Sequence, residues 1–497
     1  MVSPRARRAH DAGARLCRRL TAASVIALGL ASCAPARPGL LVPPRDLSQG
    51  ASRPRIERVV ELGGAAVRGE VQPLEAGDGV AVVGEALWLR GPGFGRQPTV
   101  RLGGEVTPVL GFTADGGLVV RVPAGAATGR QALSVRTAAG QAETVVEVKR
   151  FAAAWDAAGQ LSWVDAGVPA PLAGLAPSVP LVAHLAFSSD GRAAYVVGPD
   201  GRRLTVVDMT AQGGPRAVFA LELEGTPVLG LEASRGAPVL ALVREEDVMV
   251  LDTTEALRPP RSRPRPLPPE VRAGRPVGAA LSPDGQHLAV ALAGSGHVAL
   301  LALSDRADAR LVAHEKVDTA VSAPPLVDLS FSPDGRTLWV LSGSTPKTAE
   351  PSLGPAHVTA FSVAGSLQAP LTGARRFALG EASFPVALAV SPARPLPSGA
   401  AIRTPPVEAQ VFVSAQDQGE AGGGLFAVAA AATPLLATLP SPPTASMVDA
   451  RGQWVFTCVA GPGGAELVWV RANERPTTPG RAPIKGLTSG CRLEGQP

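Results

Sequence analysis

The chain has 497 residues, of which 45% are hydrophobic and 18% charged, which excludes an intrinsically disordered chain and allows several domains. The formal net charge is +5, but residues 1–32 alone carry six arginines against one aspartate, so the rest of the chain is close to neutral. This distribution excludes nucleic acid as an expected partner.

The first 32 residues have the order of a signal peptide. An arginine-rich region ends at Arg19, and the apolar run "LTAASVIALGL" (20–30) is too short to span a bilayer as a stable anchor, which predicts a cleaved export signal. The sequence "LASC" at 30–33 then resembles the bacterial lipobox. The resemblance implies that Cys33 becomes the lipidated N-terminus; an ordinary signal peptide with a chance cysteine is the alternative.

The segment that follows Cys33 predicts how the protein is tethered. Residues 33–55 read as the lipidated cysteine and an extended, proline-rich tether. Ala34, rather than an aspartate, follows the cysteine, which by the enteric-type sorting rule favours the outer membrane. No later stretch is long and apolar enough to be a transmembrane helix. We therefore expect an exported protein that meets the membrane through its N-terminal lipid.

Two cysteines remain after the leader and the lipid site are set aside, namely Cys458 and Cys491. An even pair in an oxidising compartment predicts a disulfide, with two free thiols as the alternative.

Residues 56–150 predict a β-sandwich, because short apolar strands alternate with glycine-rich turns every 8–12 residues. The stretches "ALWLRGPGFG" (86–95), "TVRLGGEVTPV" (99–109) and "LVVRVPAGAATGRQALSVRTAAG" (118–140) resemble an IPT/TIG domain, which implies an immunoglobulin-like fold. The residues that carry the family's turns are Gly91, Gly93 and Phe94, then Val122 and Pro123. "GPGFG" does not match the phosphate-binding loops, so we expect Phe94 to close a tight turn from the core side.

Residues 151–497 contain one turn repeated between apolar runs. Its copies include "FSSDG", "LSPDG" and "FSPDG", and aligned copies begin at Ser188, Ser234, Ser282, Ser332, Ser391 and Asp449. Asp-Gly and Pro-Asp-Gly are hairpin turn sequences. A period near 46–50 residues with four short strands per unit indicates a β-propeller. The units resemble YVTN-type or WD-like propeller repeats.

The number of blades depends on the two ends of this region. Residues 152–167 read as the later strands of a unit without its first strand, and residues 482–495 read as a first strand without partners. Pairing the two would build a seventh blade and remove exposed edges. We therefore predict an all-β chain with an immunoglobulin-like sandwich and a six- or seven-bladed propeller, with seven favoured. A disulfide between Cys458 and Cys491 would hold such a ring closed.

The sequence predicts no catalytic residue, cofactor or metal site. Five histidines follow the leader without metal-ligand spacing, and His297 and His357 start equivalent strands, which favours a structural role. "STPK" (344–347) lacks the partner motifs of a Ser-x-x-Lys enzyme, and "REED" (244–247) reads as a charged hairpin tip.

An arginine-rich segment at 258–276 is the one candidate for a binding surface. Its prolines predict an extended loop between blades, protruding from one rim of the ring, and arginine pairs well with anionic groups. A solvated loop is the alternative. The candidate residues are Arg258, Arg261, Arg263, Arg265, Arg272 and Arg275.

Together these features predict a cell-envelope lipoprotein that is a non-catalytic binding or scaffolding module for protein or glycan partners. The alternative is a propeller enzyme of lactonase or lyase type that works from the central channel. The expected domains are residues 1–32, 33–55, 56–150 and 151–497.

Overall fold

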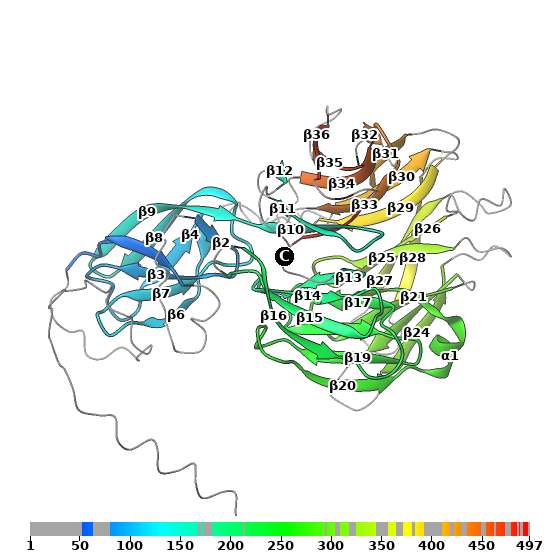
Figure 1. Ribbon diagram of the computed structural model, residues 1–497, viewed down its shortest axis with the longest axis horizontal. Coiled ribbons are helices and arrows are strands. Elements are labelled where there is room, and N and C mark those ends of the chain that lie inside the picture. Colours follow the sequence, from blue (N-terminus) through cyan, green and yellow to red (C-terminus); the bar gives the residue numbers. More distant parts are fainter. Residues whose placement is uncertain are drawn as a thin grey trace, which may run out of the picture. The chain divides into compact units, whose positions relative to one another are not determined.

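The computed structural model describes residues 52–62, 80–166, 170–171, 181–211, 214–293, 296–303, 309–317, 325–343, 356–363, 371–379, 383–391, 410–417, 422–428, 435–448, 454–461, 464–472, 479–484, 487 and 491–495. The chain divides into two compact units, and every described residue belongs to the second, Pro38–Pro497. The leader and Cys33 lie outside the described residues. The described residues are β-structure and loops, with one short α-helix among them (Figure 1).

Two β-sheets built from residues 58–149 share one hydrophobic core. Leu89 and Val120 of one sheet and Leu133 and Val146 of the other belong to the same buried cluster. One sheet has the order β1 (Arg58–Glu61), β3 (Ala86–Arg90), β7 (Leu118–Arg121) and β6 (Val109–Phe112), and the other has the order β2 (Val80–Val82), β9 (Gly140–Lys149), β8 (Gly129–Thr137), β4 (Thr99–Leu102) and β5 (Glu105–Val106).

The turn after β3 is built as the sequence predicts. Gly91 and Gly93 have φ angles of +148° and +83°, in the region that favours glycine. A Cβ atom at Gly91 would overlap the carbonyl oxygen of Arg55. The two glycines let the chain fold back so that Phe94, only 2% exposed, enters the shared core.

Six antiparallel four-stranded sheets follow one another along the chain from His184 on, each with its strands paired in sequence order. Their strands are β13 (His184–Phe187), β14 (Ala193–Val197), β15 (Arg203–Asp208) and β16 (Arg216–Glu222); β17 (Gly230–Ala233), β18 (Val239–Val243), β19 (Asp247–Asp252) and β20 (Arg261–Pro266); β21 (Pro276–Leu281), β22 (His287–Leu292), β23 (His297–Ala302) and β24 (Arg310–Lys316); β25 (Leu326–Phe331), β26 (Thr337–Ser342), β27 (His357–Val363) and β28 (Leu371–Ala378); β29 (Ser383–Val390), β30 (Val411–Asp417), β31 (Gly423–Val428) and β32 (Leu435–Leu439); β33 (Pro443–Val448), β34 (Trp454–Gly461), β35 (Gly464–Arg471) and β36 (Gly480–Pro483).

One further four-stranded sheet combines both ends of the repeat region. Its order is β37 (Cys491–Gly495), β10 (Phe151–Asp156), β11 (Leu161–Asp165) and β12 (Ala170–Pro171). β37 pairs antiparallel with β10, with Ala154 opposite Leu493. The predicted pairing of the chain ends is therefore present. The predicted extent of the last strand was too long, because residues 480–483 belong to β36 of the preceding sheet.

The first strands of these sheets contact one another in cyclic order. β13 contacts β17, and the contacts continue through β21, β25, β29 and β33 to β37, which in turn contacts β13. Figure 1 shows β13, β17 and β25 toward the middle of this arrangement and β20, β24 and β36 at its periphery. Sheets that radiate from a ring of inner strands form a β-propeller.

Neighbouring sheets pack through apolar side chains on both faces. Tyr195 of β14 and Leu242 of β18 lie in one buried cluster, and Val243 of β18 and Val290 of β22 lie in the next. All five residues of β14, "AAYVV", are buried. Burial on both faces explains why the central strands are continuous apolar runs rather than alternating ones.

Cys458 lies beside the strand that joins the chain ends. It is fully buried on β34, in a cluster that includes Leu493 of β37 and Ala154 of β10, and it is disulfide-bonded. β34 and β37 are in contact. Cys491, the first residue of β37, remains the partner that the sequence predicts.

We expect Cys458→Ala and Cys491→Ala each to lower the free energy of unfolding by roughly 3 kcal/mol, because either change would free the loop between the two cysteines. The double variant should lose little more than either single variant. Denaturant titration of the three variants measures this, with unreduced and reduced wild type as controls. Additive losses would contradict the predicted pairing.

Candidate functional site

Three of the repeated turns, those at Ser188, Ser282 and Ser332, are held by one arrangement of a serine and an aspartate. The hydroxyl of Ser332 donates to Asp334 Oδ1 (2.6 Å), which also accepts from the amide of Arg336 (3.0 Å), while Ser332 Oγ accepts from the amide of Thr337 (2.9 Å). Ser282 and Asp284 form the same contacts one sheet earlier. These bonds explain why the Ser-x-Asp turn recurs: each such turn fixes a tight hairpin between the first and second strands of its sheet.

The hydrogen bonds also set the charge of these aspartates. Burial by itself would raise the pKa of Asp334, but the bonds from Ser332 and from the Arg336 amide outweigh burial and lower that pKa. The pKa of Asp284 is lowered in the same way. The turn aspartates are therefore fixed negative charges at neutral pH.

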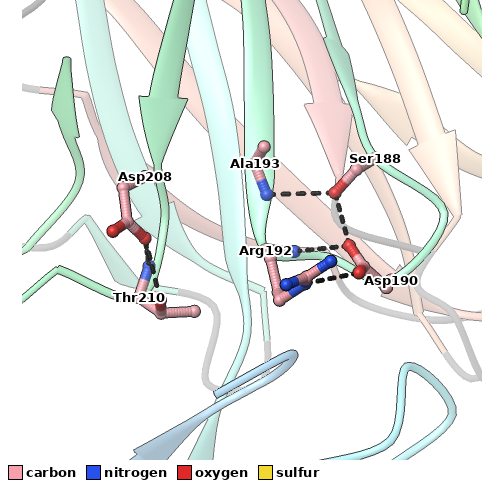
Figure 2. A network of polar contacts seen from close by, with 6 residues as sticks. All are labelled: Ser188, Asp190, Arg192, Ala193, Asp208 and Thr210. Carbon is pink, nitrogen blue, oxygen red and sulfur yellow. Dashed lines mark hydrogen bonds and ion pairs between the residues drawn. The ribbon is translucent and has the colours of Figure 1, made fainter. Parts of the chain in front are cut away.

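The first copy adds a partly buried ion pair to this arrangement. Figure 2 shows Ser188 and Asp190 bonded as in the other turns, and the Nε of Arg192 lies 2.5 Å from Asp190 Oδ2. Arg192 is only 4% exposed. Burial would raise the pKa of Asp190, but Arg192 and the hydrogen bonds lower it. The pair is a rigid structural feature of this turn.

Asp208 is a second buried carboxylate in the same view. It accepts hydrogen bonds from the amide and the hydroxyl of Thr210, both at 2.8 Å (Figure 2). Burial nevertheless raises its pKa, because the hydrogen bonds compensate for only part of the lost hydration. Both of these hydrogen bonds close a local turn, which explains the buried carboxylate of Asp208 as a structural group.

The histidines occupy separate structural positions. The rings of His297 and His314 stack on β23 and β24 with centroids 4.6 Å apart. His357 is buried at the start of β27, where its Nε2 lies 3.0 Å from Ser342 Oγ. The equivalent strand starts predicted for His297 and His357 are observed.

The "REED" segment forms the predicted hairpin tip between β18 and β19. Arg244 makes a two-pronged contact with Asp247, with Nε–Oδ1 and Nη2–Oδ2 distances of 2.6 and 2.7 Å. "STPK" lies outside the described residues.

The arginine-rich segment differs from the predicted protruding loop. Arg261, Arg263 and Arg265 lie in β20, the outermost strand of its sheet, and Arg272 lies in helix α1 (Pro269–Gly274), which leads to the next sheet. The prediction of extended backbone is confirmed for β20 but is wrong for α1, where the buried side chain of Val271 anchors the helical turn. Pro264 and Pro266 occupy this edge strand, where a missing N–H is tolerated.

The exposure of the arginines varies along the segment. Arg258, Arg272 and Arg275 are exposed, and Arg258 lies 2.5 Å from Glu255 in an exposed ion pair. Arg265 is partly buried. The side chains of Arg261 and Arg263 lie outside the described residues. The structure thus presents three described arginines to solvent: Arg258 lies before β20, and Arg272 and Arg275 lie in the connection from β20 to β21 of the next sheet.

Three polar residues on the inner strands had not been singled out from the sequence as a group. His184 lies on β13, Asp328 on β25 and Arg492 on β37. Asp328 Oδ2 accepts from the amide of Leu388 on the next inner strand (2.9 Å), and Oδ1 accepts from the amide of Leu329 (2.8 Å). Arg492 Nη1 donates to the carbonyl oxygen of Ala183 (3.1 Å).

Their environments shift two of the pKa values strongly. Burial raises the pKa of Asp328 to about 6, although two amides bond the carboxylate. Burial, and then the positive charge of Arg492, lower the pKa of His184 to about 4. His184 is therefore neutral at pH 7. The signal that could have found these residues is repeat position: His184 and Asp328 each stand four residues before a turn serine.

Two further features are absent from the described residues. Within those ranges no group of three or more His, Cys, Asp or Glu side chains could hold a metal ion. In the same part of the chain, no helix is long and apolar enough to cross a membrane.

No protein-family model matches the sequence, and no curated protein matches it. Similar solved structures include a proposed 6-phosphogluconolactonase from Bacteroides fragilis, with 14% identity, a TM-score of 0.47 and coverage of 70% of this chain and 98% of that one. Apo AztD from Citrobacter koseri has 11% identity, coverage of 70% and 98%, and a TM-score of 0.46. The propeller domain of Cps50 (Swd1) from Myceliophteria thermophila has 16% identity, coverage of 62% and 90%, and a TM-score of 0.44.

We expect Asp328 and Asp334 to give opposite pH dependences of stability. The raised pKa of Asp328 means that protonation favours the folded state, so its contribution is present at low pH and is lost as the pH rises through about 6. The lowered pKa of Asp334 gives a contribution that is present at neutral pH and lost on acidification.

Denaturant titration of wild type, Asp328→Asn and Asp334→Asn between about pH 7 and 3 measures these terms. Relative to Asp328→Asn, wild type should gain roughly 2 kcal/mol on acidification to about pH 4.5. Relative to Asp334→Asn, wild type should lose stability only below about pH 4, where this carboxyl becomes protonated. Parallel pH profiles for all three proteins would refute the assignment.

Proposed function

We propose that this chain is a lipid-anchored protein of the bacterial envelope that binds or scaffolds protein or glycan partners without catalysis. In this reading an immunoglobulin-like domain precedes a seven-bladed propeller. The observation that carries the binding role is the set of exposed arginines, Arg258, Arg272 and Arg275, next to an outermost strand that bears three more.

Seven blades are supported by the seven four-stranded sheets of the described repeat region and by the cyclic contacts of their first strands. The β37–β10 pairing supports closure by both ends of the chain. For the domain before it, support comes from two sheets around one core and from the turn that buries Phe94. Residues 56–150 and 151–497 then correspond to the two folded domains.

The arginine surface favours an anionic partner. Guanidinium groups bind carboxylates and phosphates in a two-pronged geometry and stay charged at any physiological pH. Arg272 and Arg275 lie at the end of a short helix held by the buried side chain of Val271, so their positions are fixed by the fold. An acidic polysaccharide or an acidic protein face of the envelope has the complementary chemistry.

We expect Arg258→Gln/Arg272→Gln/Arg275→Gln to weaken binding to polygalacturonate, a carboxylated polymer, about tenfold, because exposed ion pairs contribute roughly 0.2–1 kcal/mol each. Affinity chromatography against polygalacturonate and neutral dextran measures this, with a salt gradient to test the electrostatic origin. Arg202→Gln/Arg216→Gln/Arg310→Gln is a matched control, since these arginines are also exposed but lie in or directly beside other sheets. Equal losses in both triple variants would point to non-specific charge attraction instead.

The membrane anchor has its own test. Because "LASC" resembles a lipobox, we expect Cys33→Ser to abolish incorporation of labelled fatty acid and to release the protein from the membrane fraction. Cys17→Ser, within the leader, is the control and should leave both unchanged. Labelled lipid retained on the Cys33→Ser protein would exclude Cys33 as the attachment site.

A further inference from the structure

The seven first strands, which form the inner ring, each contribute one residue at an equivalent position of the repeat. These seven residues lie at the same level of the ring. His184, Gly230, Gly278 and Asp328 each lie four residues before their turn serine and are paired with equivalent second-strand residues, Val197, Val243, Ala291 and Leu341. Ala387 and Ala445 occupy this position in β29 and β33. Arg492 occupies it in β37, opposite Trp155 of β10.

The composition of this level is unusual for the interior of a ring. Four of its seven members are glycine or alanine, and the other three are an arginine, a histidine and an aspartate. A Cβ atom at Gly230 or Gly278 would approach only one atom within 4 Å, at 3.9 Å in each case. The Cβ position is therefore uncrowded at both glycines.

Two of the polar side chains at this level reach toward the next inner strand around the ring. Arg492 of β37 bonds the carbonyl of Ala183, directly before β13, and Asp328 of β25 bonds the amide of Leu388 in β29. In both cases the polar group is held by backbone atoms of the neighbouring strand. Its position is thus set by the packing of two sheets rather than by a loop.

The three polar residues divide into two groups on opposite sides. β37 and β13 are neighbours, so Arg492 and His184 stand together. β25 is the third inner strand from β13 in one direction and the third from β37 in the other. The carboxylate of Asp328 therefore stands across the ring from a guanidinium and an imidazole.

The charges at this level fit a ligand with two different ends. Arg492 makes no ion pair among the described residues, and its guanidinium retains donors beyond the one bonded to Ala183. His184 is neutral at pH 7 and can donate one ring N–H. Each carboxylate oxygen of Asp328 accepts one hydrogen bond from a backbone amide and retains a lone pair for a further donor.

We propose that this ring level, formed by Arg492, His184 and Asp328 with the open positions at Gly230 and Gly278, binds a small zwitterion in the centre of the propeller. The carboxylate of the ligand bonds Arg492 and His184, and its ammonium group bonds Asp328. The ligand class is an amino acid or a short peptide. This site is separate from the peripheral arginine surface and does not depend on it.

Isothermal titration calorimetry with the membrane-extracted lipoprotein tests the proposal, using the proteinogenic amino acids and glycylglycine as probes. At least one of these should bind with a Kd below about 1 mM. Its methyl ester lacks the carboxylate and its N-acetyl derivative lacks the ammonium group, so each should bind at least about tenfold more weakly. Absence of binding by every probe, or equal binding of the two derivatives, overturns the proposal.

Variants then place the site. Arg492→Gln and Asp328→Asn should each raise the Kd about tenfold or more, and Gly278→Leu should abolish binding by filling the open space. Arg481→Gln, an exposed arginine on β36, is the control and should leave the Kd unchanged. Gly230→Leu repeats the filling test on another strand, in case Gly278→Leu fails to fold. Unchanged binding in both leucine variants would exclude the channel.

The same variants separate this proposal from the peripheral surface. The Arg258/Arg272/Arg275 triple variant should keep zwitterion binding, and Gly278→Leu should keep polygalacturonate binding. Either function can therefore fail without the other.

Discussion

The pairing of β37 with β10 is the constraint on which the ring depends. Each sheet buries both of its faces against neighbours, so a linear row of sheets would end in two exposed apolar faces. Building one sheet from both ends of the repeat region removes those faces, because the strand at 491–495 completes the sheet begun at 151–165. Every other contact between inner strands can form locally along the chain. Closure is the one step that joins residues more than three hundred positions apart.

Much of the propeller can be predicted from sequence because its hairpin turns are determined by residues close together in the chain. The Ser-x-Asp turn is a short-range network whose bonds span two to five residues, and its hairpins are accordingly found where the pattern places them. Glycine-dependent turns such as Gly91–Phe94 are local as well. The pairing of the chain ends could also be predicted, because each end carries an incomplete set of strands.

The features that the sequence does not reveal are those created by long-range packing. The bond from Leu388 to Asp328 spans 60 residues, and that from Arg492 to Ala183 spans 309. The residues next to Asp328 in the sequence do not indicate that this carboxyl is buried or that its pKa is raised. The prediction of a protruding loop for the arginine-rich segment was wrong for a different reason. Its prolines predict extended backbone, whereas α1 forms because Val271 is buried against neighbouring strands. Polar residues at an equivalent repeat position are informative only once the ring is known.

The prolines of β20 have a consequence for association between copies of this chain. A peripheral strand normally offers a row of unpaired amides to which another chain could add. Pro264 and Pro266 are two residues apart, so their nitrogen atoms point to the same side of the strand, and neither has a proton to donate. An incoming strand would find no donor at either position. Two copies of this chain are thus hindered from joining edge to edge at this sheet.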